Sequence, residues 1–362
     1  MLMAMTSSDS PRIVLTRPGD LLGAIPYLIG FHPAESLVIA GFTGRSPSGR
    51  LRLTTRWDLP IQTESLGRLV PLLRREGVEQ VMLAGFGPGH LVTPAVDRVI
   101  ELVRVAGIDL TEALRAHDGR YWSYLCTRAD CCPAEGVPYD PAAGPVAATA
   151  TMTGLVALPD RASLERSLAP RAGAARVSMR QTTARVIAGV RGALTAELTA
   201  GFVAAGLKRV RQAIATYRDG ARLGDVEAAR LGLDLAVIRI RDEAWALLAD
   251  DTLDAHLALW KDLTRRLEPR FVPPAAALLG AAAWRGGDCA LAGLAVERAL
   301  AIDPTYSMAR LLQEGLWHLI SPDVLRGRMP TPEELDEQMG PPSVTWLGPL
   351  IALLGEPAAE VG

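Results

Sequence analysis

The sequence predicts an α/β N-terminal domain, with helices on a mixed sheet, followed by an all-α, tetratricopeptide-like C-terminal domain. Strand and helix patterns alternate through residues 1–125, whereas long Ala- and Leu-rich stretches dominate 147–325. Aromatic residues make up only 5% of the chain, which favours closely packed helices over a β-sandwich. A loop or linker rich in Cys, Pro and Gly at 126–146 separates the two domains, and a tail with a short apolar segment follows at 326–362.

The first domain is expected to alternate strands, helices and hairpins. Pro18 suits the first turn of a helix, and β-branched or alternating runs are typical of strands. The Asp-Gly pair at 118–119 favours a tight hairpin turn, because both residues tolerate positive φ. The expected elements are a short apolar run at 13–16, strands at 36–42, 51–57, 81–86, 108–117 and 121–125, and helices at 18–29, 63–76 and 92–106.

The second domain is expected to be helical throughout. A pair of helices at 273–306 follows the tetratricopeptide pattern, in which small residues let two helix backbones approach and a proline ends the second helix. Residues 307–320 suggest the start of another such helix. The long helical stretches lie at 175–219, 225–248 and 251–268, and the residues that match the repeat pattern are Leu279, Gly280, Ala292, Val296, Ala299 and Pro304.

Composition and charge exclude several classes of function. The 38 basic and 40 acidic residues give a net charge of −2 without a basic cluster, so we expect no nucleic-acid partner. The N-terminus lacks the basic and apolar regions of a secretory signal, and the longest apolar stretches are too short to span a bilayer. We therefore expect a soluble, cytoplasmic protein with no membrane partner.

Three of the four cysteines, Cys126, Cys131 and Cys132, fall within the stretch "CTRADCC". Structural zinc sites usually use two close pairs of ligands, and His117 would lie about 20 Å from Cys126 at about 3.3 Å per strand residue. We therefore assign no metal to these residues. A regulatory or catalytic thiol stays open, but the favoured interpretation is that the thiols pack as small apolar groups beneath the loop.

Two other stretches carry polar candidates. His32, in "GFHP", follows the first expected helix, and we favour a helix-capping role for its imidazole over ligand binding. Arg241 and Asp242 lie in "IRIRDEAW", together with Arg239 and Glu243, which are one helical turn apart. That segment is either a solvated ion-pair face or a buried arginine docked against the N-terminal domain. No Ser-His-Asp or H-E-x-x-H arrangement occurs, so we assign no catalytic residue.

Three phrases together resemble one protein family. They are "LLGAIPYLIGFHPAESLVIAGF" at 21–42, "DGRYWSYLCTRADCCPAEG" at 118–136 and "AAWRGGDCALAGLAVERALAIDPTYSMARLL" at 282–312. Their order and content are similar to an uncharacterised actinobacterial family, domain of unknown function 4192. The family has no assigned activity, so the resemblance implies no mechanism. A glycine usually follows "GD" in the third phrase, and Cys289 at that position implies that this cysteine is not part of a shared site.

For function, we expect a non-enzymatic binding or scaffold protein that acts through its helical domain. Helical repeats create concave surfaces that suit a protein or peptide partner. The alternative is a thiol-dependent or small-molecule-binding enzyme with its site at the Cys126–Cys132 loop. The sequence indicates neither a cofactor nor an oligomeric state.

Overall fold

The computed structural model describes residues 17–44, 49–152, 156–191, 199–322 and 329–355. The chain forms two compact units: 1–165 with 287–290, and 166–286 with 291–362. The apolar run expected at 13–16 lies outside the described residues. Within the described ranges, no helix has both the length and the apolar character needed to cross a membrane.

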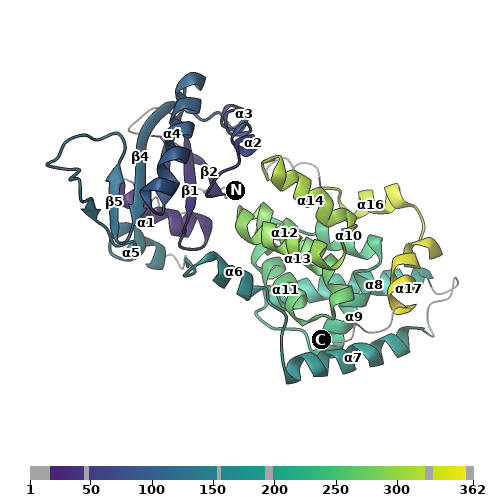
Figure 1. Ribbon diagram of the computed structural model, residues 1–362. Coiled ribbons are helices and arrows are strands. Elements are labelled where there is room, and N and C mark those ends of the chain that lie inside the picture. The colour runs from purple at the N-terminus through teal and green to yellow at the C-terminus, as the bar shows by residue number, and fades with distance from the viewer. Residues whose placement is uncertain (1–16, 45–48, 153–155, 192–198, 323–328, 356–362) are drawn as a thin grey trace. The chain divides into compact units, whose positions relative to one another are not determined.

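The first unit is built on a mixed six-stranded sheet with the order β2-β1-β3-β4-β5-β6 (Figure 1). Strands β3 and β4 are parallel, and the other neighbouring strands of this sheet are antiparallel. The sheet therefore combines hairpins with two crossover connections, from β2 to β3 past β1 and from β3 to β4, as a mixed α/β domain should. The strands are β1 (Ser36–Thr43), β2 (Arg50–Asp58), β3 (Gln80–Phe86), β4 (Asp109–His117), β5 (Arg120–Ser123) and β6 (Val137–Pro138).

Helix α4 (Gly89–Ala106) makes the crossover from β3 to β4 and packs against both strands. The contact is close, because a Cβ atom on Gly85 would lie 2.1 Å from Cγ1 of Val92. Residues 36–42 of β1 are all buried, which is typical of a central strand covered on both faces. The other helices of this part of the chain are α1 (Pro18–Ile29), α2 (Thr63–Leu66), α3 (Leu69–Arg75), α5 (Pro145–Met152) and α6 (Arg161–Ser167).

The mixed sheet is confirmed, and two expected elements differ in detail. The single helix expected at 63–76 is two short helices, because the chain turns at Gly67, a poor helix former. The strand expected at 121–125 ends at Ser123, whose side chain accepts hydrogen bonds from the following backbone. Strand β6 lies inside the segment 126–146, so part of the expected linker pairs with the sheet.

The second unit is mostly helical, and its centre is α12 (Val272–Arg285). Residues 272–284 of this helix are all buried, because α11 and α14 pack against it. A Cβ atom on Gly280 would lie 2.9 Å from Cγ2 of Val296, so the backbones of α12 and α13 approach closely there. The remaining helices are α7 (Ala174–Arg191), α8 (Thr199–Arg218), α9 (Asp225–Asp234), α10 (Ile238–Ala246), α11 (Leu253–Arg266), α13 (Cys289–Ile302), α14 (Ser307–Trp317), α16 (Pro332–Met339) and α17 (Gly348–Gly355), with short 3-10 turns at Asp250–Thr252, Pro269–Phe271 and Val344–Leu347.

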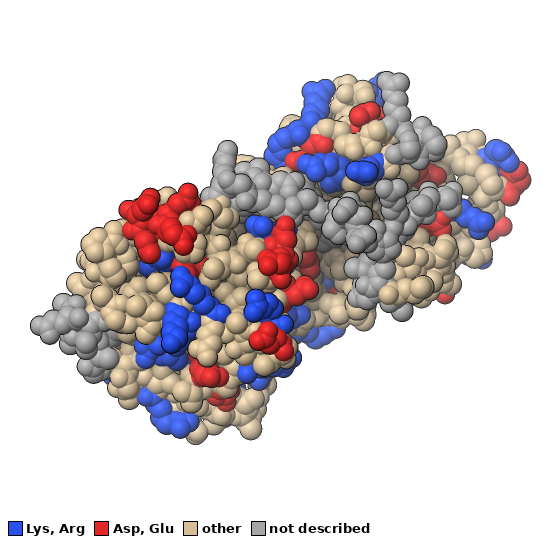
Figure 2. Space-filling model, turned by 180° about the vertical axis from the view of Figure 1, so that it is seen from behind, with Lys and Arg blue, Asp and Glu red and all other residues tan. Residues whose placement is uncertain are grey.

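The charged surface of the molecule is mixed in sign. Figure 2 shows basic and acidic side chains interspersed over the visible face. The chain as a whole carries 38 basic and 40 acidic side chains, which give a net charge of −2.

Candidate functional site

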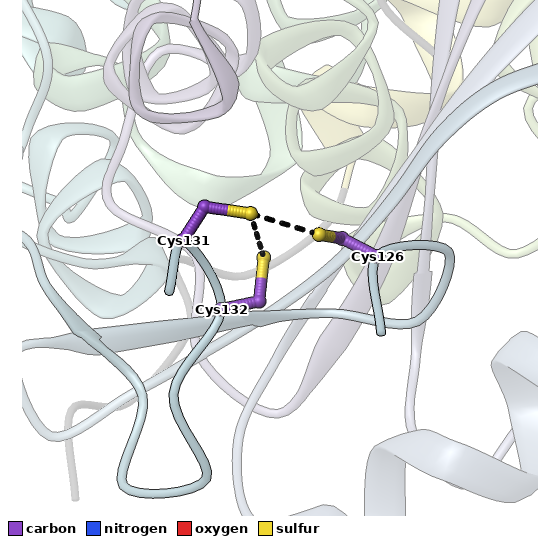
Figure 3. Close-up of side chains that lie close together, drawn as sticks. All are labelled: Cys126, Cys131 and Cys132. Atoms are coloured by element: carbon purple, nitrogen blue, oxygen red, sulfur yellow. Dashed lines mark hydrogen bonds between the residues drawn. The ribbon is translucent and has the colours of Figure 1, made fainter. Parts of the chain in front are cut away.

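Three thiols converge in the loop that connects β5 to β6 (Figure 3). The Sγ atoms of Cys126 and Cys131 are 3.1 Å apart, and those of Cys131 and Cys132 are 3.8 Å apart. All three sulfur atoms lie within 4.8 Å of one another. We call these three residues the thiol cluster.

The end of strand β5 positions Cys126. The Ser123 hydroxyl oxygen accepts hydrogen bonds from the backbone N–H groups of Leu125 and Cys126, each at 3.1 Å. The same hydroxyl donates to Oε1 of Glu112 on β4, at 2.9 Å. Because one side chain satisfies two successive amides, the chain leaves the strand in a fixed turn.

A second turn positions Cys131 and Cys132. Their backbone N–H groups donate to the carbonyl oxygen of Arg128, at 3.3 and 2.8 Å. The Arg128 guanidinium binds both carboxylate oxygens of Asp130, at 3.2 and 2.7 Å. The two adjacent cysteines share this turn, and the Cys131 sulfur contacts those of both Cys126 and Cys132.

The far side of the loop is tied to Trp122 on β5. The indole N–H donates to the carbonyl oxygen of Ala134 at 3.0 Å, and the Arg115 guanidinium lies over the ring at 3.7 Å from its centre. Gly136 has φ of 84°, and a Cβ atom there would lie 2.5 Å from the indole. Only glycine combines this conformation with this contact.

The electrostatics of the cluster favour a negative charge on Cys126. The pKa of the Cys126 thiol is lowered, because its sulfur accepts hydrogen bonds from the thiols of Cys131 and Cys132. The same interaction raises the pKa of Cys131, and raises that of Cys132 to about 12. A lowered pKa favours the thiolate form of Cys126, which is the nucleophilic form of a cysteine.

The thiols are not buried, which corrects the interpretation of packed apolar groups. Cys131 is exposed and the other two are half-buried, whereas Cys289, in α13, is buried. The loop therefore leaves the cluster accessible, and one hydrogen bond from Trp122 ties it down at Ala134. A small oxidant or a metal ion can therefore reach the cluster from solvent.

The other sequence candidates lie elsewhere. His32 follows α1, and its backbone N–H donates to the Leu158 carbonyl at 2.9 Å. Gly30, in the left-handed conformation, is the C-cap of that helix. His117 lies in the β4–β5 hairpin, 3.3 Å from Asp118. Neither histidine belongs to the group of close metal-ligating side chains found among the described residues.

Arg241 and Asp242 lie on α10, in the second unit, and form an ion pair at 2.5 Å. Arg241 also approaches the Tyr306 hydroxyl at 3.4 Å. The neighbouring Arg239 is 1% exposed and binds Glu243 at 2.9 Å and Asp336 at 2.7 Å. The solvated ion-pair interpretation is therefore wrong for Arg239, and the partners of this buried arginine belong to α10 and α16, within the same unit.

The convergence of all three thiols was not expected from the sequence spacing. It depends on Ser123, Trp122 and Gly136, none of which is among the candidate site residues of the sequence. One signal was available: a serine three residues before Cys126, at the end of a strand, is a common turn-forming arrangement. The contact between Trp122 and Gly136 has no comparable signal in the sequence.

Fold and site together define a two-unit protein in which an α/β unit presents an exposed cluster of three thiols and a second unit is helical. The chain belongs to the family described as Domain of unknown function (DUF4192), whose model matches residues 18–323. No curated protein and no solved structure matches the chain.

Proposed function

We propose that the protein exchanges a dithiol for a disulfide at Cys126 and Cys131. The observation that carries this function is the distance of 3.1 Å between their sulfur atoms, in a loop that solvent reaches. A disulfide bond is about 2.05 Å long, so closure needs a shift of about 1 Å in one side chain. Exposed pairs of this kind form labile, exchangeable bridges rather than structural ones.

The exchange uses an external disulfide as the oxidant. The Cys126 thiolate attacks one sulfur of that disulfide, forms a mixed disulfide and expels one thiolate. Cys131 then loses its proton to solvent and attacks the Cys126 sulfur, which forms the Cys126–Cys131 bond and expels the second thiolate. The protein gives up two electrons, and the external disulfide becomes two thiols.

Cys126 is the attacking residue because it carries the lowered pKa. Cys131 is the resolving residue because its sulfur is the one 3.1 Å away. We propose that the protein is cytoplasmic. The reducing agents of the cytoplasm would reduce the Cys126–Cys131 disulfide to thiols between cycles.

The test is oxidation of the full chain with glutathione disulfide, followed by mass spectrometry. We expect a mass loss of about 2 Da after removal of the glutathione, and a peptide that links Cys126 to Cys131. Cys126→Ser and Cys131→Ser should abolish the internal bond. Cys289→Ser, a matched control at a buried cysteine of α13 outside the cluster, should leave it unchanged. A bridge that forms equally well in Cys131→Ser would overturn this assignment.

A second proposal concerns the helical unit, for which we infer a protein or peptide partner. The close crossing of α12 and α13 at Gly280 supports tetratricopeptide-like packing of the hairpin at 273–306. Leu311 on the neighbouring α14 is 60% exposed and offers an apolar contact. Chemical cross-linking of the full chain and of Leu311→Asp in native extract tests this idea. A partner cross-linked in equal yield to both proteins contradicts the use of this surface.

A further inference from the structure

The third thiol of the cluster has no part in the exchange at Cys126 and Cys131. We propose that Cys126, Cys131 and Cys132 together bind one thiolate-preferring metal ion, with Zn²⁺ as the ion that the geometry fits. This site goes beyond the proposed exchange and does not depend on it, because Cys132 is required only for the metal.

The spacing of the sulfurs matches a metal centre. The three sulfur atoms form a triangle with two sides of 3.1 and 3.8 Å and a third side no longer than 4.8 Å. The point equidistant from the three sulfurs therefore lies no more than about 2.4 Å from each of them. The Zn–S bond length is about 2.3 Å. A single ion can therefore reach all three sulfurs without a large movement of the loop.

The sulfur atoms also have the correct chemical character. Thiolates are soft ligands that select Zn²⁺ and Cu⁺ over Mg²⁺ or Ca²⁺. In a tetrahedral zinc site the sulfurs are about 3.8 Å apart, which equals the distance between Cys131 and Cys132. The shorter contact between Cys126 and Cys131 has to open, by about 0.7 Å.

The fourth position of the metal faces solvent. Among the described residues, the group of close metal-ligating side chains contains only the three cysteines. Two carboxylates of this region are already engaged: Asp130 binds Arg128, and Glu112 accepts from Ser123 and from the Ala113 amide. Three protein ligands with an exchangeable fourth are typical of sites that bind or transfer a ligand rather than of closed structural sites.

The loop holds its ligands in place before a metal arrives. The amides of Cys126, Cys131 and Cys132 are each hydrogen-bonded, to Ser123 or to the Arg128 carbonyl. Ligands whose backbone is already ordered lose little conformational freedom when they bind an ion. Arg128, which lies close enough to interact with all three thiols, offsets part of the negative charge of the cluster.

The experiment measures metal binding to the reduced full chain in the absence of oxygen. Zn²⁺ is titrated in competition with a chromophoric chelator, and Co²⁺ is used as a spectroscopic probe of thiolate ligation. We expect one ion per chain for the wild type and for Cys289→Ser, with the intense near-ultraviolet absorption of thiolate-to-cobalt charge transfer. We expect Cys132→Ser to bind Zn²⁺ at least about 100-fold more weakly.

The same variant separates this proposal from the exchange reaction. Cys132→Ser should still form the Cys126–Cys131 bond with glutathione disulfide, and circular dichroism checks that it is folded. Equal zinc affinity in the wild type and Cys132→Ser would overturn the three-thiol site. Loss of zinc binding in Cys289→Ser, with Cys132→Ser unaffected, would also overturn it and place the metal elsewhere.

Discussion

Acid should destabilise the helical unit through one buried histidine, His256, on α11. Its side chain is fully buried, and the Trp260 indole N–H donates to its Nδ1 atom at 3.0 Å. Because an indole N–H can only donate, Nδ1 carries no proton, and the neutral ring is protonated at Nε2. Burial is the main cause that lowers the pKa of His256 from 6.5 to about 4, and the nearby Arg285 contributes in the same direction.

The sign and size of the effect follow from proton linkage. The unfolded chain binds a proton at His256 near pH 6.5, whereas the folded chain does not until about pH 4. Between these values the unfolded state holds more protons, so the free energy of unfolding falls as the pH falls. At about 1.4 kcal/mol per pKa unit, the loss between pH 7 and pH 4 is about 3 kcal/mol.

The assay is urea denaturation at several pH values, for the wild type and for His256→Gln. Glutamine keeps an acceptor for the Trp260 indole but does not titrate, so its curve should lack the contribution of His256. Carboxylates that titrate in the same range affect both proteins and cancel in the difference. Parallel curves for the two proteins between pH 7 and pH 4 would refute the reasoning.

Three further predictions concern the loop and the helix packing. Gly136→Ala places a methyl group against Trp122 at a residue with positive φ. It should lower the free energy of unfolding by at least about 1 kcal/mol. It should also reduce the rate of disulfide formation, which mass spectrometry measures. Arg239→Ala removes one partner from the buried Glu243 and should lower the free energy of unfolding by about 3 kcal/mol in urea. Gly280→Val places a side chain where α12 and α13 pack closely. It should lower the free energy of unfolding in urea by about 1–3 kcal/mol.

Each of these variants has a matched control. Gly119→Ala also changes a glycine with positive φ, but its Cβ atom meets only one carbonyl oxygen at 3.8 Å, so it isolates backbone strain from the clash. Asp336→Asn alters the exposed partner of Arg239 and should cost less than about 1 kcal/mol. A Cβ atom on Gly293 meets nothing within 4 Å, so Gly293→Ala should not destabilise α13. Equal losses in a variant and its control would contradict the corresponding prediction.

The sequence was most informative where local pattern decides structure. Pro18 and Gly30 bound the first helix at the expected residues, and the Asp-Gly pair at 118–119 forms the hairpin between β4 and β5. Runs of β-branched and apolar residues, with alternation at 51–57, predicted the strands of the sheet. These signals act over a few residues, so they can be read without knowledge of the tertiary structure.

The sequence was least informative where distant residues meet. Arg239 is buried because Asp336, 97 positions further along the chain, reaches it from α16. The thiols converge because Trp122 holds the loop at Ala134, 12 positions away. The spacing of residues along the chain does not reveal such contacts.

Most of the contacts that hold the thiol cluster lie within a short span of the chain. The hydrogen bonds and ring contacts that order the loop mainly join residues between Glu112 and Tyr139, and the Tyr124 hydroxyl adds one hydrogen bond to Thr93 on α4. The site is thus a largely local unit carried by β4, β5, β6 and their connections. Grafting this segment onto the edge of an unrelated antiparallel sheet should preserve the arrangement of the three sulfurs. The loop could then introduce thiol chemistry into an engineered protein.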